Sequence, residues 1–216
     1  MRTRSLGLMV VATSVALLGG QARLPTDIHS ESLSRLPPVQ RSQLTDEGKR
    51  IWDSIAGSGR ALPRTGPAQV SMHSPNAAEP IHALNQYLRK TVVGSRFFEL
   101  SALIAAREFD QQYEWSGHEP AALRAGLEQS VIDVVKFNRD VTGLSEKDAT
   151  VIRLGRALLR EHTVSSDLWA KTVALFGAQG AVEITAIIGD YVMAGLMLTA
   201  VDQQLPADRK ALLPPR

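Results

Sequence analysis

The chain has 216 residues, 44% of them hydrophobic, and this length suits one domain with a substantial core. It contains no cysteine, which excludes disulfide bonds, thiolate metal sites and thiol peroxidase chemistry. A formal net charge of +2 gives no electrostatic case for binding nucleic acid.

The first 22 residues have the pattern of a secretory signal peptide. Arg2 and Arg4 precede an apolar run from Leu6 to Leu18, and small residues lead to Ala22. The run is too short for a good transmembrane span. We expect cleavage after Ala22 and a periplasmic or secreted protein without a stable membrane span; an uncleaved anchor is the alternative. Cleavage leaves 22 basic and 22 acidic residues, so the mature chain is about neutral.

Residues 23–44 are polar and include the Pro37-Pro38 pair, so we expect an extended N-terminal arm. The arm either lies across a partner subunit or is a disordered leader. Residues 45–216 are expected to form a helical domain, which begins with Thr45 as the N-cap of its first helix.

The chain after this first helix shows helical periodicity and no alternating strand pattern. Residues 57–75, rich in Gly and Pro, are expected to be a loop. Asp110 is predicted to cap a short helix, and Pro120 to begin another that ends at Gly126. The other helices are expected at Ala77 (capped by Asn76) to about Val93, Phe97–Arg107, Val131–Phe137, Ser145–Arg160, Ser165 or Ser166 to Gly177, and Val182–Val201. The sequence therefore predicts an all-α, single-domain bundle of about seven helices.

The segment Val182–Val201 is the longest apolar stretch of the domain. Its length would permit a membrane span, but it contains Gly189, Asp190 and Gly195. These residues favour a buried helix in the core of an oligomer.

Polar and aromatic residues gather between residues 96 and 126. His118 follows Glu114 by four residues and Gln111 by seven, so we expect the three to share one helix face. Glu99 lies on the preceding helix and would face them if the two helices pack as a hairpin. A carboxylate and an imidazole in an apolar groove make an acid/base pair. The alternative is a structural or surface pair.

This stretch resembles the signature of the carboxymuconolactone decarboxylase family, which includes the alkylhydroperoxidase D-like proteins. The family pattern has a Glu after a basic residue, eleven intervening residues, and a polar segment ending in His, which in the peroxidase branch is Cys-x-x-Cys-x-x-x-His. Glu99 and His118 match this frame, while Gln111 and Glu114 stand at the cysteine positions. The segment QYEWSGH resembles the cysteine-free branch.

Three flanking segments extend the resemblance to roughly residues 36–206. They are LPPVQRSQLTDEGKRIWDSI, similar to the family's arm and first helix, GPAQVSMHSPNAAEP, similar to a turn before the second helix, and VEITAIIGDYVMAGLMLTAV, similar to the last long helix. The resemblance implies an alkylhydroperoxidase D-like bundle that assembles into a homotrimer or homohexamer.

The resemblance also implies a reaction without metal or organic cofactor. In the family's decarboxylase a lactone carboxylate leaves as CO2, and the resulting dienolate is protonated on carbon. His118 is then expected to be the general acid/base, with Glu99 orienting it or exchanging the proton itself. Glu114 is either a second base or part of a surface charge pair.

Residues near Glu99 and His118 are expected to bind the substrate. Tyr113 or Gln111 could donate a hydrogen bond to the enolate oxygen, and Arg107 or Arg96 could pair with the substrate carboxylate. His73 lies in the turn that, in the resembling family, is near the pocket; a structural role in the turn is its alternative.

We therefore predict a cofactor-free lyase acting on a small carboxylated lactone or keto acid. One alternative is a non-catalytic, oligomeric helical binding protein. Another is a protein grouped with the peroxidases by family although it lacks the Cys-x-x-Cys. Because the family's lactones are normally processed in the cytoplasm, the expected signal peptide raises a different substrate as an alternative, such as an external aromatic or lignin-derived acid, and the sequence does not choose among these.

Overall fold

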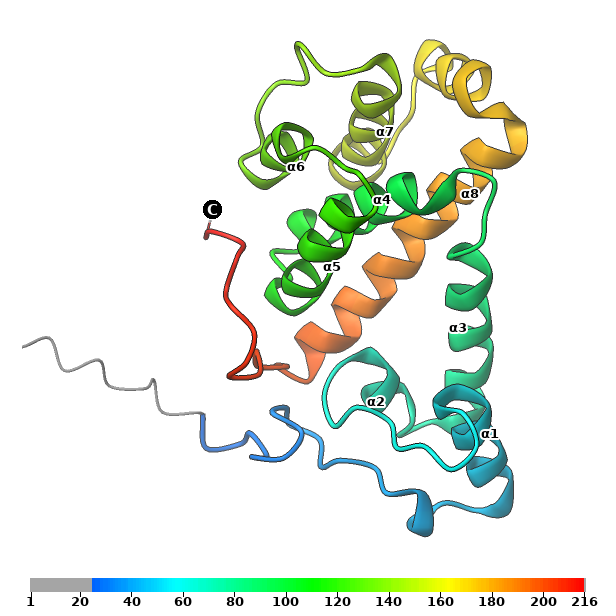
Figure 1. Ribbon diagram of the computed structural model, residues 1–216, viewed down its shortest axis with the longest axis vertical. Coiled ribbons are helices and arrows are strands. Elements are labelled where there is room, and N and C mark those ends of the chain that lie inside the picture. The colour runs from blue at the N-terminus through cyan, green and yellow to red at the C-terminus, as the bar shows by residue number, and fades with distance from the viewer. Residues whose placement is uncertain (1–24, 216) are drawn as a thin grey trace, which may run out of the picture.

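The computed structural model describes residues 25–215, and within these residues it contains eight α-helices and no β-strand (Figure 1). The predicted all-α class is confirmed. The expected signal peptide, residues 1–22, lies outside the described residues. The helices are α1 (Asp46–Ala56), α2 (Pro67–Ser71), α3 (Pro75–Leu88), α4 (Gly94–Glu108), α5 (Gln112–Arg124), α6 (Gln129–Lys136), α7 (Glu146–Arg156) and α8 (Ser166–Ala200), with a 3-10 turn at Arg41–Gln43 and a π-helical turn at Ala157–Glu161.

Three predicted helix starts are confirmed by their capping hydrogen bonds. The side-chain oxygen of Thr45 accepts from the backbone N–H of Gly48 at 3.1 Å. Ser145 and Ser165 cap α7 and α8 in the same way, each at 3.2 Å. Each cap satisfies an N–H group that has no partner within the helix.

The predicted boundaries around α5 are wrong in two respects. Asp110 does not cap the helix, because its backbone is left-handed at φ 49°; Gln111 caps it instead, accepting from the N–H of Tyr113 at 3.2 Å. Pro120 lies inside α5 and does not begin a new helix. Packing of α5 on α4 maintains the helix across this proline, because burial of Trp115 offsets the lost backbone bond.

Two other boundaries differ from the prediction. Helix α3 begins at Pro75 after Ser74 and ends at Leu88, well short of Val93. The expected loop 57–75 contains the short helix α2, whose first residue is a proline that needs no backbone donor.

Helix α8 is bent at Gly177, whose φ of 72° and ψ of 167° interrupt the helix where the sequence predicted an end. By length and composition α8 could also cross a membrane, but half of its most apolar window is buried in the structure. It packs against α2, α3, α4 and α7 and carries the buried carboxylates Glu183 and Asp190.

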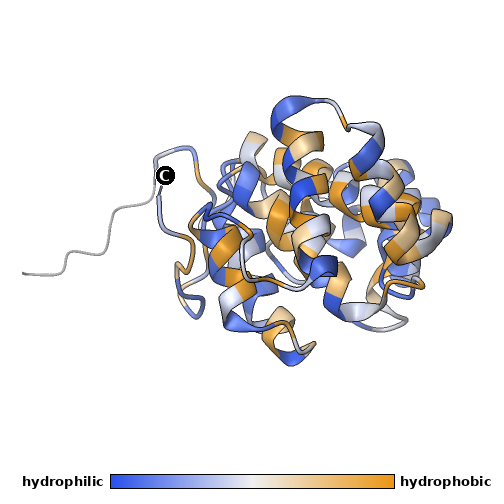
Figure 2. Ribbon diagram, turned by 90° about the horizontal axis from the view of Figure 1, so that it is seen from above, coloured by the Kyte–Doolittle hydropathy of each residue, from blue (hydrophilic) through white to orange (hydrophobic). Residues whose placement is uncertain are grey.

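Buried apolar side chains form three clusters, and the ribbon coloured by residue hydropathy shows hydrophobic and hydrophilic residues interspersed along the helices (Figure 2). The largest cluster joins α4, α5, α6, α7 and α8 around Trp115, Ile152 and Leu154. A smaller one joins α1, α2 and α3 around Trp52 and Met72. The third cluster joins α3, α4 and α8 around Leu88, Phe98 and Tyr191.

The N-terminal segment from residue 25 lies against the end of α8 in the same chain. The N–H of Arg35 donates to the carbonyl of Val201, and the N–H of Gln204 donates to that of Leu33, both at 2.7 Å. These bonds attach the expected arm to its own helical bundle.

Candidate active site

Glu99 on α4 and His118 on α5 form a buried pair at the centre of the helical hairpin. His118 Nδ1 lies 2.7 Å from Glu99 Oε2. The side chains are only 12% and 9% exposed, so water screens this contact poorly. The two predicted catalytic residues are therefore brought together.

Glu114 contacts the other nitrogen of the same imidazole. Its Oε2 lies 3.3 Å from His118 Nε2, one helical turn away. Its Oε1 is buried and has no hydrogen-bond partner among the described residues. The imidazole thus lies between two carboxylates, and one carboxylate oxygen is left for a ligand.

The surroundings of His118 favour its charged form. Burial lowers the pKa of His118, but the hydrogen bonds with Glu114 and Glu99 outweigh burial and raise the pKa to about 9. The ring of Tyr191 meets the imidazole edge-on at 4.6 Å, which fixes the plane of the ring. At neutral pH the site holds an imidazolium.

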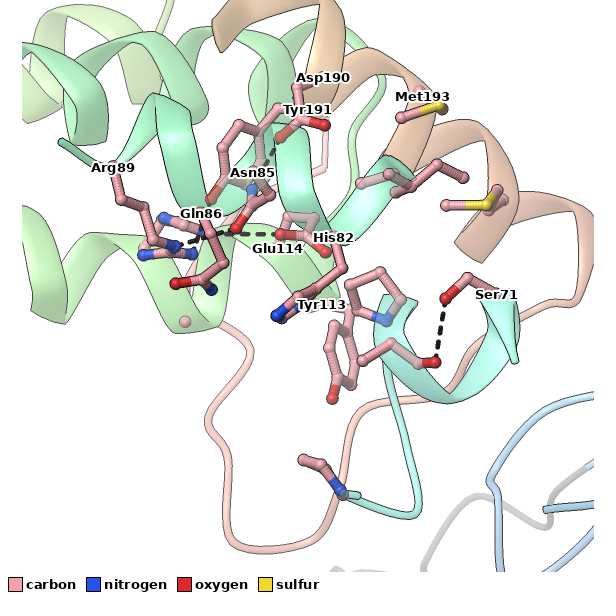
Figure 3. Close-up of a pocket in the computed structure, with 18 of the residues that line it drawn as sticks. Ser71, His82, Asn85, Gln86, Arg89, Tyr113, Glu114, Asp190, Tyr191 and Met193 are labelled. Atoms are coloured by element: carbon pink, nitrogen blue, oxygen red, sulfur yellow. Dashed lines mark hydrogen bonds and ion pairs between the residues drawn. The ribbon is translucent and has the colours of Figure 1, made fainter. Parts of the chain in front are cut away.

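A cavity of about 510 Å³ borders this group (Figure 3). Helices α3, α5 and α8 supply most of its wall, which includes both polar and apolar side chains. Figure 3 shows Arg89, Asn85, Tyr191 and Glu114 toward one side, and Ser71 and Met193 toward the other. Its polar lining includes His82, Asn85, Arg89, Glu99, Glu114, His118, Asp190 and Tyr191, and its apolar lining includes Ile55, Pro67, Ala68, Ile81, Met193, Ala194 and Met197.

Tyr113 lines the cavity as predicted, and its position depends on a glycine. Its hydroxyl lies 2.9 Å from Thr65 Oγ1, and the Arg209 guanidinium lies 4.5 Å from the ring centroid. Gly66 has φ 93°, and a Cβ there would lie 2.6 Å from the Tyr113 hydroxyl oxygen. Only glycine fits both the backbone and the space.

The other predicted substrate-binding residues do not line this cavity. Gln111 donates to the hydroxyl of Thr199 at 3.0 Å, because as the N-cap it lies off the helix face shared by Glu114 and His118. Arg107 is buried and donates to the carbonyl of Pro214 at 2.8 Å. His73 is exposed and bonds the carbonyl of Pro37 at 3.0 Å, which matches its structural alternative.

Several cavity residues were not predicted from the sequence. Asn85 on α3 and Arg89, the C-cap of that helix, face Asp190 and Tyr191 on α8. Burial raises the pKa of the Asp190 carboxyl, although a hydrogen bond from Asn85 opposes this. A sequence signal existed, because Asp190 and Tyr191 interrupt the most apolar segment of the chain.

Within residues 25–215, no three His, Asp or Glu side chains are arranged to hold a metal ion. The two acids nearest the imidazole are already directed at its nitrogens. The arrangement is suited to moving protons.

Solved structures with this arrangement of helices are known. An uncharacterized peroxidase-related protein from Ralstonia eutropha JMP134, described as an alkylhydroperoxidase AhpD core, matches with a TM-score of 0.62 and 16% identity, over 82% of this chain and 94% of that one. The fold is alkylhydroperoxidase D-like. The debrominase Bmp8 in complex with 2,3,4-tribromopyrrole matches with a TM-score of 0.59 and 18% identity, over 79% of this chain and 91% of that one.

A third match, to a protein of unknown function from Agrobacterium tumefaciens, has a TM-score of 0.59 and 19% identity, and covers 66% of this chain and 99% of that one. No family model and no curated protein matches this sequence. At these identities the likeness establishes the alkylhydroperoxidase D-like fold and leaves the activity to be argued from the site.

Proposed function

We propose that the protein is a cofactor-free lyase that decarboxylates a small carboxylated lactone or keto acid by acid/base catalysis. The observation that carries the proposal is the imidazole of His118, held between Glu99 and Glu114 beside the cavity. The sequence resemblance to the carboxymuconolactone decarboxylases supports this reaction class.

The reaction breaks one carbon–carbon bond. The substrate carboxylate leaves as CO2, and the electron pair of the broken bond enters the conjugated carbonyl to give an enolate. The enolate carbon then takes one proton, which solvent later restores to the protein. The protein must stabilise negative charge and deliver a proton; in this proposal the His118 imidazolium supplies the positive charge, and its proton reaches the substrate through Glu114.

Glu114 and His118 act in this proposal as one proton-transfer pair. Both imidazole nitrogens contact carboxylates, so the group facing the cavity without a partner is Glu114 Oε1. Glu114 exchanges the proton with the substrate, and His118 resupplies it. Glu99 holds the imidazole through Nδ1 and stabilises its charge.

The cavity suits a small molecule. Its volume of about 510 Å³ lies within the range typical of small-ligand sites, roughly 300–1,000 Å³. A protein of this fold, the debrominase Bmp8, binds the small aromatic ring 2,3,4-tribromopyrrole. We extend that ligand size, and not its chemistry, to this chain.

We further propose that the protein is exported and forms a homotrimer or homohexamer. Exposed apolar side chains on adjoining parts of α3 and α8, namely Leu84, Tyr87 and Val182, line one surface groove and support an interface there, because a group of such side chains indicates a protein contact. The mass of the purified protein in solution tests this assembly, and a monomer would contradict it.

The decisive experiment is a turnover assay with γ-carboxymuconolactone and related keto acids, following ultraviolet absorbance and CO2 release. Wild type is compared with His118→Ala, Glu99→Gln and the control His73→Ala, whose ring lies outside the cavity. Loss of turnover in the first two variants, with unchanged melting, supports the lyase. Equal loss of stability in both, or an inactive wild type, would favour a binding protein.

A further inference from the structure

The Arg89 guanidinium is fixed at the cavity wall by uncharged groups. Its Nε donates to Asn85 Oδ1 at 2.9 Å, and its Nη2 donates to the Tyr191 hydroxyl at 3.1 Å. It also lies 4.8 Å from the centroid of the Phe98 ring. Three contacts from α3, α4 and α8 therefore orient one planar cation.

This environment distinguishes Arg89 from most arginines of the chain. Arg41, Arg50 and Arg160, for example, each contact a carboxylate. Among residues 25–215 no carboxylate lies within ion-pair distance of Arg89, and its side chain lines the cavity. Asp190 interacts with this charge only at longer range, through Asn85, so it does not occupy the guanidinium. A preorganised guanidinium without a direct ion pair is suited to a carboxylate, which it can bind through two parallel hydrogen bonds.

The same cavity contains the complementary feature, the partnerless Oε1 of Glu114. Tyr191 links the two, because its hydroxyl accepts from Arg89 while its ring contacts His118. A ligand that fits carries an anionic group for Arg89 and an O–H or acidic C–H for Glu114.

We infer that Arg89, positioned by Asn85 and Tyr191, binds the carboxylate of the substrate. This inference rests on the proposed function, which identifies the ligand as a carboxylated substrate. Arg89 replaces Arg107 and Arg96 as the residue expected to pair with the substrate carboxylate. Arg107 donates to Pro214, and Arg96 pairs with Asp148 at 2.5 Å, so both are committed to the framework.

The test measures binding, not turnover, with 4-fluorobenzoate and its uncharged isostere 4-fluorobenzamide as probes, each followed by fluorine NMR on the purified protein. Wild type should prefer the carboxylate. Arg89→Gln should weaken carboxylate binding by about ten- to a hundredfold, the loss expected for charge-assisted hydrogen bonds, and leave amide binding unchanged. Arg89→Lys keeps the positive charge but loses the paired N–H groups of the guanidinium, so it should retain part of the preference for the carboxylate over the amide.

The matched control is Arg209→Gln, which removes the other arginine of the cavity wall. It should leave the preference for the carboxylate intact. Three results would overturn the inference. Wild type could show no preference for the carboxylate over the amide, Arg89→Gln could keep that preference, or Arg209→Gln could abolish it. An inactive enzyme with an Arg89-dependent preference would refute the decarboxylase and leave this subsite standing.

Discussion

Glu114 Oε2 lies 3.3 Å from His118 Nε2, while Oε1 of the same carboxylate is buried without a partner. Burial of an unsatisfied carboxylate oxygen costs free energy in the unliganded protein. A ligand that donates a hydrogen bond to this oxygen recovers that cost, so the position is one that a substrate can exploit.

Replacement of Glu114 by Gln should uncouple the proton-transfer pair without changing its shape. The pKa of His118 should fall from about 9 toward its ordinary value of 6.5, since one of its two charged neighbours is lost. Turnover should fall by about 10²- to 10⁴-fold, the usual contribution of general acid–base catalysis. NMR titration of the imidazole and the decarboxylation assay measure the two effects. The exposed Glu161→Gln is the control, and an unchanged His118 pKa would refute the coupling.

The stability of the protein should depend on pH through His118. Its pKa is raised in the folded state, so its contribution to the free energy of unfolding is complete below pH 6.5 and is lost as the pH rises through about 9. Urea unfolding at several pH values should show this decline in wild type. In His118→Ala the free energy of unfolding should change less with pH over the same range. An equally steep decline in this variant would show that other groups cause it.

A second buried ion pair provides a test of stability alone. Lys136 Nζ lies 2.7 Å from Glu119 Oε1, and the other oxygen of Glu119 accepts from Trp115 Nε1. Lys136→Met leaves the Glu119 charge buried and unpaired, so it should lower the free energy of unfolding by about 3–5 kcal/mol. Neither residue lines the cavity, so activity per folded molecule should not change. A loss below about 1 kcal/mol would show that water reaches the pair.

Gly66→Ala should displace Tyr113 and disturb the cavity. The change imposes positive φ on an alanine and a Cβ 2.6 Å from the Tyr113 hydroxyl, and should destabilise the fold by about 1–3 kcal/mol or more. Gly59→Ala is a matched control, because Gly59 also has positive φ but a Cβ there meets nothing within 4 Å. Thermal melting of both variants separates backbone strain from the clash. Equal melting temperatures would show that Tyr113 moves freely.

The sequence predicted the Glu99–His118 pair because the two helices that carry it are adjacent in the chain. The spacing placed Glu114 and His118 on one face of α5, and a short connection favoured a hairpin with α4. The prediction that Gln111 shares the helix face of Glu114 and His118 was wrong, because α5 begins one residue later than predicted. Asp110 and Gln111 are both polar residues that can act as an N-cap, so the sequence does not fix which of them begins the helix.

Arg89 and Asp190 could not be placed from the sequence in the same way. Arg89 meets Tyr191, and Asn85 meets Asp190, only because α3 packs against α8, and the partners in each pair are more than 100 residues apart in the chain. Helical periodicity identifies the buried face of each helix but does not say which helix covers it.

The cavity is lined by separately packed parts of the chain, so ligand binding should stabilise the folded state. Its wall combines Ile55 and Ile81, from the part built on α1 to α3, with Glu99 on α4 and Tyr191 on α8. Any molecule bound there holds both parts together, and at one hundred times its dissociation constant it should add about 2.7 kcal/mol to stability. Heat resistance of the protein in the presence of candidate acids can therefore identify the physiological substrate before any product has been characterised.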